Sequence, residues 1–229
     1  MYTVRPEEAK ENHPAVSAFI DGSVRKICNL EPDLIIGFSD IQADLAAKLI
    51  RANQQVLIFN QRSIDEILEV ILTIGRIVSA ENKARELVRS YKSKIDQVKQ
   101  RSLELEYRPK VYFEEWDKPT FSAIRWVSEI IEIAGGDDVF SEKSFGKLAS
   151  EREIQWEDVI KMNPDIILAS WCGKPVDIDS IKQRPGWESI RAVKEDKIHE
   201  IDPSIILQPG PACLTDGLRV IEKIIRDVH

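Results

Sequence analysis

A short motif occurs twice in this chain, 132 positions apart. Residues 23–33 read SVRKICNLEPD, and residues 155–165 read QWEDVIKMNPD. In each copy, apolar residues at helical spacing predict a short helix, which must end before the proline because proline cannot continue it. A four-residue apolar run follows each Pro-Asp, at 34–37 and 166–169, and is short enough for a buried parallel strand. Unless the likeness is coincidental, the repeat predicts two similar α/β lobes.

The segment between the two copies predicts a helical connection. Residues 63–105 contain no proline, and their Ile, Leu and Val residues recur at i, i+3 and i+4. Ser63 and Glu66 have the spacing of a capping box, so we expect one helix from there to about Val78. A second, longer helix is expected from about Ala80. Such a helix is a rigid connector, unlike a flexible Gly/Ser linker.

We therefore expect three parts: a first lobe at 1–62, connecting helices at 63–107 and a second lobe at 108–229. The second lobe opens with a strand at 110–115 and a helix at 122–134 that ends at Gly-Gly. The repeat places the counterparts of this strand and helix before the first residue. Either the first lobe is smaller by one βα unit, or the chain is a truncated form. A sheet edge exposed in this way favours pairing with another chain, so we expect either a homodimer or reduced stability.

Composition argues against several classes of protein. The 229 residues include 39 acidic and 32 basic ones, a net charge of −7 without a basic patch, which argues against nucleic-acid binding. No apolar run approaches 18 residues and no secretory leader follows Met1, so the sequence predicts neither a membrane span nor an export signal. Cys28, Cys172 and Cys213 lack CxxC spacing, which predicts no disulfide framework or metal site. We expect them to be small buried residues.

The sequence carries none of the common catalytic motifs. It lacks GxSxG, HExxH, Walker and GxGxxG patterns, and His13, His199 and His229 share no spacing with a nucleophile. The acidic run FEEWD at 113–117 raises the alternative of paired carboxylates or a metal site. Adjacent acids at a strand end usually face opposite ways into solvent, and we favour that interpretation. We therefore expect no enzyme activity, no metal and no cofactor.

Aromatic and turn residues follow the predicted strands of both lobes. The residues are Phe38, Trp116, Phe121, Trp171 and Gln208. In parallel α/β sheets, ligands lie beyond the carboxyl ends of the strands. The sequence therefore predicts a cleft between the lobes, in which rings stack on a flat or bulky ligand.

Four stretches of the second half resemble one family. They read KVYFEEWDKPTFSAIRWVSEIIEIAGG, ILASWCGKPVD, RPGWESI and IILQPGPACLTDGL. Together they resemble the substrate-binding proteins of ABC importers, specifically the cobalamin- and siderophore-binding group. The resemblance implies two Rossmann-like lobes joined by a long helix, which enclose a corrinoid without chemistry and deliver it to an ABC permease. A ferric siderophore or haem is the alternative ligand.

The resemblance also implies which residues bind the ligand. The implied positions are Phe19 and Phe38 in the first lobe and Trp116 or Phe121, Arg125, Trp171 and Gln208 in the second. Trp126, next to Arg125, fits either the cleft or the core.

Members of this family dock on the permease through one acidic residue in each lobe. The matching position in the second lobe is Glu157, and its counterpart 132 positions earlier is Arg25. Because a like-charge contact weakens docking and steering, the resemblance implies either a weaker contact or a substitute acid such as Asp21.

Two other classes of function stay open beside this one. The resemblance implies a periplasmic or other extracytoplasmic location, although no leader follows Met1. A genuine start at Met1 would instead favour a cytoplasmic binding or sensor protein with the same lobes. The third hypothesis is an enzyme of a two-lobed α/β type, which no group of residues in the sequence supports.

Overall fold

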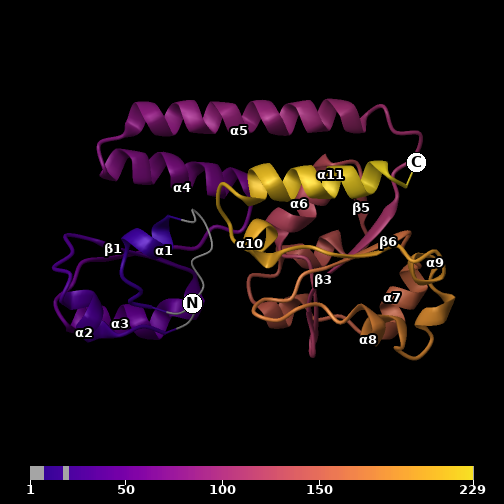
Figure 1. Cartoon of the computed structure of the whole chain (residues 1–229), viewed down its shortest axis with the longest axis horizontal. Helices are drawn as coiled ribbons and strands as arrows, with labels where there is room; N and C mark the ends of the chain where they lie inside the picture. Colours follow the sequence, from indigo (N-terminus) through magenta and orange to yellow (C-terminus); the bar gives the residue numbers. More distant parts are fainter. Residues whose placement is uncertain (1–7, 18–20, 229) are drawn as a thin grey trace. The chain divides into compact units, whose positions relative to one another are not determined.

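Parallel strands flanked by helices make up both halves of the chain, which confirms the expected α/β class (Figure 1). The computed structural model describes residues 8–17 and 21–228. The chain divides into two compact units, Met1–Gln61 and Arg62–His229, here called unit 1 and unit 2. The helical segment expected at 63–107 therefore groups with unit 2. Within the described residues, none of the helices is both long enough and apolar enough to cross a membrane.

In the described part of unit 1, residues 8–17 and 21–61, the sheet has two parallel strands. β1 (Ile35–Phe38) pairs with β2 (Val56–Phe59), and β1 begins one residue later than predicted. The predicted helix before it is α2 (Val24–Cys28). Ser23 caps its amino end, because the Ser23 hydroxyl accepts a hydrogen bond from the Lys26 backbone N–H. The other elements are α1 (Ala9–Asn12), a 3-10 turn at Asp40–Gln42 and α3 (Ala43–Arg51). Ile27, Leu45 and Leu49 pack in one buried cluster.

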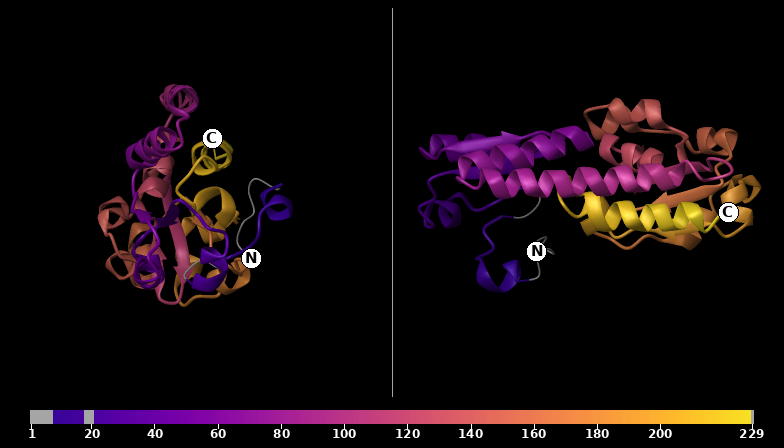
Figure 2. Two further views of the ribbon diagram at one scale, coloured as in Figure 1. Left: turned by 90° about the vertical axis from the view of Figure 1, so that its left-hand side faces the viewer. Right: turned by 90° about the horizontal axis from the view of Figure 1, so that it is seen from above.

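Unit 2 begins with two helices that run side by side, α4 (Ile64–Ile77) and α5 (Glu81–Ser102) (Figure 2). The predicted capping box is confirmed. The Ser63 hydroxyl accepts a hydrogen bond from the Glu66 backbone N–H, and the Glu66 carboxylate accepts one from the Ser63 N–H. The helices approach closely at Gly75, because a Cβ there would lie only 2.4 Å from a side-chain atom of α5.

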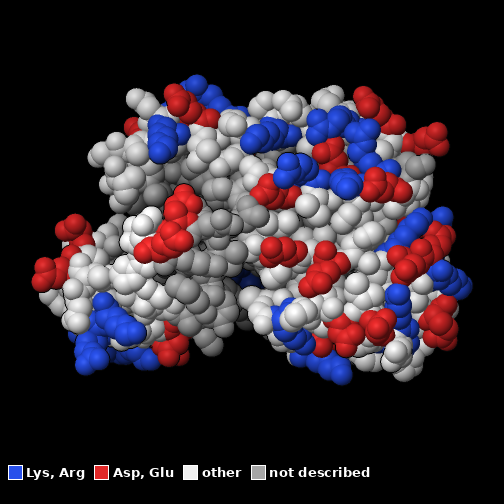
Figure 3. Space-filling model, viewed as in Figure 1, with Lys and Arg blue, Asp and Glu red and all other residues white. Residues whose placement is uncertain are grey.

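The second of these helices, α5, is long and forms an ion pair with the last helix of the chain. At 1.5 Å per residue, the 22 residues of α5 extend about 33 Å. Arg101 of α5 and Glu222 of α11 (Leu218–Arg226) form two hydrogen bonds, of 2.6 and 2.9 Å. Figure 3 shows basic and acidic side chains intermingled over α5 and α11 on the face in view. This face therefore carries both signs of charge rather than a single-sign patch.

The sheet of unit 2 has the strand order β4-β3-β6-β7, and β5 also pairs with β3. All of its pairings are parallel except that of β4, which turns back against β3 as a hairpin. The strands are β3 (Lys110–Asp117), β4 (Thr120–Ser122), β5 (Asp137–Asp138), β6 (Ile166–Ala169) and β7 (Ile198–Glu200). The second predicted repeat strand is confirmed residue for residue as β6.

Helices cover both faces of this sheet. Alternate strand residues point to opposite sides, so both faces carry apolar side chains that the helices bury. α6 (Arg125–Ile133) and α11 lie above the sheet in Figure 1, and α7 (Trp156–Met162) and α8 (Ile178–Lys182) lie below it. On the side of α7 and α8, Tyr112, Ile167 and Ala169 pack in one buried cluster. The remaining elements are 3-10 turns at Ser141–Phe145, Ala149–Arg152 and Trp187–Ser189, α9 (Arg191–Lys194), α10 (Pro203–Ile206) and a π-turn at Cys213–Gly217.

Trp126 belongs to the core of unit 2. Its indole is buried and donates a hydrogen bond of 2.8 Å to the carbonyl oxygen of Ile206. The helix that carries it, α6, begins three residues later than predicted, because residues 120–122 form β4 instead. It ends before Gly135, whose φ of +99° is one that glycine adopts without a steric penalty. The predicted Gly-Gly stop is therefore confirmed.

Candidate functional site

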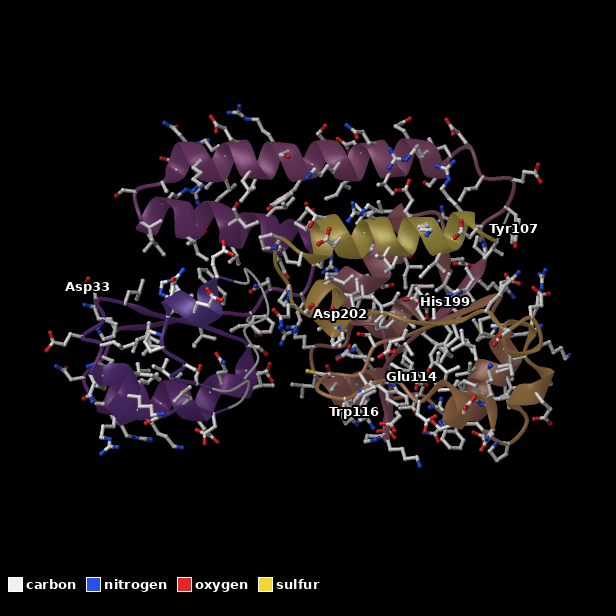
Figure 4. All side chains as sticks on the ribbon, viewed as in Figure 1. Asp33, Tyr107, Glu114, Trp116, His199 and Asp202 are labelled. Carbon is white, nitrogen blue, oxygen red and sulfur yellow. The ribbon has the colours of Figure 1, made fainter. Side chains whose placement is uncertain are left out.

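Three acidic residues at the carboxyl end of β3 each pair with a different cation. The pairs are Glu114 with Arg184, Glu115 with Arg152, and Asp117 with Lys174. In Figure 4, Glu114 and Trp116 mark this end of β3, and Tyr107 lies beyond the opposite end. The acidic run that the sequence brought to attention is therefore a set of ion pairs at the strand end where α/β proteins bind ligands.

Glu114 corrects the expectation that these acids face solvent. Its side chain is 0% exposed and accepts two hydrogen bonds from the Arg184 guanidinium, of 2.5 and 2.8 Å. The Tyr112 hydroxyl donates at 2.9 Å and the Trp171 indole N–H at 3.1 Å. Burial, followed by the charge of Glu114, raises the pKa of Tyr112 well above its ordinary value, so this hydroxyl keeps its proton. Four donors therefore satisfy one buried carboxylate.

The guanidinium of Arg184 also lies against two rings. Its carbon Cζ is 4.5 Å from the ring centroid of Trp187 and 5.0 Å from that of Trp156. Arginine stacks well on aromatic faces and binds carboxylates in a bidentate manner, which suits it to this position. Because Arg184 follows α8 and Trp156 opens α7, these contacts connect the two helices beneath the sheet to the end of β3.

Lys174 lies between two tryptophan rings. Its Nζ atom is 4.5 Å from the ring centroid of Trp116 and 4.6 Å from that of Trp171, and it donates a hydrogen bond of 2.8 Å to Asp117. Burial raises the pKa of Asp117, but the hydrogen bond and positive charge of Lys174 outweigh that effect, so the pKa lies below its ordinary value. We call Trp116, Asp117, Trp171 and Lys174 the Lys174 cluster. It combines a flat aromatic surface with a fixed positive charge.

Two of the predicted ligand-binding residues meet in the β3–β4 hairpin. Trp116 and Phe121 are paired across the two strands, and both side chains are half-buried. Trp171, in the loop after β6, contacts Lys174 as well but is only 2% exposed, so its ring offers little surface to a ligand. The neighbouring Cys172 is exposed, because it lies in the loop after β6, and the prediction that it is buried is wrong. The same prediction is confirmed for Cys213, whereas Cys28 is only half-buried.

The other predicted residues lie apart from these contacts. Arg125 forms an ion pair with Glu129 and lies over the exposed ring of Phe145, with Cζ 5.0 Å from its centroid. Gln208 is exposed and follows α10, so a helix separates it from β7. Phe38 is half-buried in unit 1. Phe19 lies outside the residues that the structure describes, and its role stays a prediction.

The predicted docking residue is on the surface of unit 2. Glu157 is exposed in the first turn of α7. It lines a pocket of about 280 Å³ with Trp156, Pro119 and Thr120, formed by the β3–β4 turn and the start of α7. In unit 1, Arg25 and Asp21 are both exposed. Permease docking through any of these residues stays a prediction.

The cations of the site could not be recognised from the sequence. Arg184 is 70 residues from Glu114, and Arg152 is 37 residues from Glu115, so no local spacing connects the partners. Only Lys174 could have been identified from local sequence, because it follows Trp171 within the turn WCGK. A lysine just after an aromatic residue at the carboxyl end of a strand could have been placed at the site.

Comparison with known proteins identifies the group to which this arrangement belongs. A family profile described as "Periplasmic binding protein" matches residues 1–205. An uncharacterized ABC transporter substrate-binding lipoprotein of Bacillus subtilis, YvrC, is 27% identical over 218 residues, which cover 90% of this chain and 66% of the relative. The chain thus spans just under two thirds of that relative's length.

A second relative and a solved structure each carry a name that states a ligand. The high-affinity heme uptake system protein IsdE of Staphylococcus aureus is 21% identical over 215 residues, which cover 88% of this chain and 70% of the relative. The crystal structure of the periplasmic vitamin B12 binding protein BtuF of Vibrio cholerae has a TM-score of 0.75 at 18% identity, and covers 99% of this chain and 86% of that one. At 18% identity, the similarity to BtuF shows a shared fold. Because the family profile spans well over half of the sequence, the chain belongs to the periplasmic binding protein family, which confirms the resemblance found in its second half.

Proposed function

We propose that this chain is the substrate-binding protein of an ABC import system and that it binds a corrinoid, which it delivers to a permease. The family membership and the name of the Bacillus subtilis relative support the transport role. The observation that carries the ligand proposal is the half-buried ring of Trp116 at the carboxyl end of β3, where a flat ligand can stack. The lipoprotein name of the same relative supports an extracytoplasmic location.

Haem is the second candidate ligand. The Staphylococcus aureus relative is named for heme uptake, and haem, like a corrinoid, is a large flat metal chelate. Lys174 beside Trp116 offers a cation to the carboxylates at the edge of a haem. A corrinoid and haem would use the same ring in the same way, so the proposal is binding by stacking, without a chemical step.

Trp116 is held in a fixed orientation, as stacking requires. Its indole N–H donates a hydrogen bond of 3.1 Å to the carbonyl oxygen of Lys118, and Lys174 lies over its ring. An aromatic contact contributes about 0.5–1.5 kcal/mol beyond the burial of area. A ring that is already fixed in this way loses little further freedom when the ligand binds.

Replacing Trp116 with leucine is expected to weaken ligand binding by about 3- to 10-fold, because leucine keeps apolar area but removes the π surface. The affinities are measured by calorimetric titration with cyanocobalamin and with haemin. Tyr107→Leu is the matched control, since this exposed ring lies beyond the amino end of β3 (Figure 4). Equal affinity of the Trp116 variant and the wild type for both ligands would rule out stacking on Trp116.

Glu157 is the proposed contact with the permease. Glu157→Lys is expected to reduce the stimulation of ATP hydrolysis by the reconstituted permease at least several-fold, because a reversed charge at an interface opposes association. Ligand affinity should not change. Glu188→Lys, a reversal at another exposed acid of unit 2, serves as control. If both reversals reduce stimulation equally, net charge rather than Glu157 governs docking.

The homodimer expected from the sequence stays a prediction.

A further inference from the structure

We propose that Lys174 selects ligands that carry an anionic group, a carboxylate or a phosphate, at the edge of the flat system that stacks on Trp116. This inference rests on the proposed function and names the class of ligand that the site accepts. It follows from which charges at the end of β3 remain accessible.

The three ion pairs differ in how far their side chains reach the surface. The Arg184 and Arg152 side chains are 5% and 3% exposed, whereas Lys174 is 39% exposed. The acidic partners are all less exposed than Lys174, with Glu114 fully buried, Asp117 at 16% and Glu115 at 21%. A ligand that approaches these three pairs therefore meets the ammonium of Lys174 as the most accessible charged group, and the site is complementary to an anion.

The ammonium group retains hydrogen-bonding capacity for a ligand. A lysine has three N–H donors, and within residues 8–17 and 21–228 Lys174 donates one hydrogen bond, to Asp117. The rings of Trp116 and Trp171 attract the positive charge without providing a conventional acceptor atom. An oxyanion at the edge of the ligand can therefore receive a charge-assisted hydrogen bond while Asp117 and both rings keep their contacts.

The loop that carries Lys174 is anchored at both ends. On one side, the Ser170 backbone N–H donates to the carbonyl oxygen of Glu114 at 2.9 Å. On the other, the Val176 N–H donates to the Glu200 carboxylate at 3.0 Å. Between them, Gly173 makes the turn with a φ of +86°. The charge is thus presented from a supported position beside Trp116, which allows it to discriminate between ligands.

The test compares Lys174→Gln with Lys182→Gln. Lys182 is a matched control, since its side chain is 34% exposed and pairs with Asp196 at 2.6 Å. Both variants lose one positive charge in the same part of unit 2. The probes are two pairs of ligands that differ in an anionic group: haemin and its dimethyl ester differ in their carboxylates, and cyanocobalamin and dicyanocobinamide differ in a phosphate. Affinities are measured by calorimetry with the full chain.

For whichever scaffold binds, Lys174→Gln is expected to weaken binding of the anion-bearing member about tenfold more than binding of the neutral member. Lys182→Gln should change neither. If Lys174→Gln has no effect, or weakens both members equally, Lys174 does not select anions, and the proposed function still stands on the binding by wild type. If wild type binds no member of either pair, the proposed function itself fails, and this inference fails with it.

Discussion

Replacing Arg184 with methionine is expected to lower the free energy of unfolding by about 3–5 kcal/mol. The substitution keeps side-chain volume but leaves the carboxylate of Glu114 buried without its cation. The hydroxyl of Tyr112 and the indole of Trp171 would still donate to it, yet neither supplies a charge. Denaturant unfolding followed by circular dichroism measures the effect.

An exposed arginine provides the comparison for this experiment. Arg85→Met removes an ion pair with Glu81 on the surface of α5, where such pairs contribute less than about 1 kcal/mol. Adding Glu114→Gln to Arg184→Met should restore more than half of the loss, because the Gln carbonyl still accepts from Trp171 and no buried charge remains. Equal losses for Arg85→Met and Arg184→Met would show that the buried pair has no special role.

Replacing Asp138 with asparagine is expected to stabilise the protein near pH 7 and not near pH 4. This side chain is buried at the end of β5, where it accepts hydrogen bonds from Ser128 and from the Phe140 N–H. Burial raises its pKa from 3.8 to about 6. The folded state therefore favours the protonated form, so stability is fully retained below pH 3.8 and decreases as the pH rises to 6. At neutral pH the ionised group costs on the order of 3 kcal/mol.

The relevant quantity is the difference in unfolding free energy between the variant and wild type, measured from pH 4 to pH 7.5. We expect this difference to rise by up to about 3 kcal/mol in favour of the variant across that range. Asp137→Asn, at the exposed neighbour on the same strand, controls for the loss of one negative charge. A difference that stays constant with pH would mean that Asp138 does not titrate in this range.

Local patterns allowed much of the fold to be predicted. The helix within each copy of the repeat, the strand after it and the capping box at Ser63 depend on residues that are close in sequence, and all are present. The β4 strand was missed because it pairs across a turn at Lys118-Pro119 and lies where a helix was expected to begin. Its sequence is too short to show a strand period.

The site was predicted less completely, because its chemistry depends on residues that are distant in sequence. The position of Trp116 at the carboxyl end of a strand could be predicted from the order of elements alone. The burial of Trp171 could not, since it depends on Lys174 above the ring and on Glu114 beside the indole N–H. Acidic residues at a strand end are predicted to be exposed, because the sequence does not show that a cation 70 residues away, such as Arg184, pairs with one of them.

The most direct test of this account is a calorimetric titration of the full wild-type chain with cyanocobalamin, dicyanocobinamide and haemin. The account predicts one-to-one binding of at least one of them with a Kd on the order of 1 μM or tighter, together with quenching of tryptophan fluorescence. The absence of binding heat and of quenching with all three ligands would contradict the claim that this chain binds a large flat metal chelate.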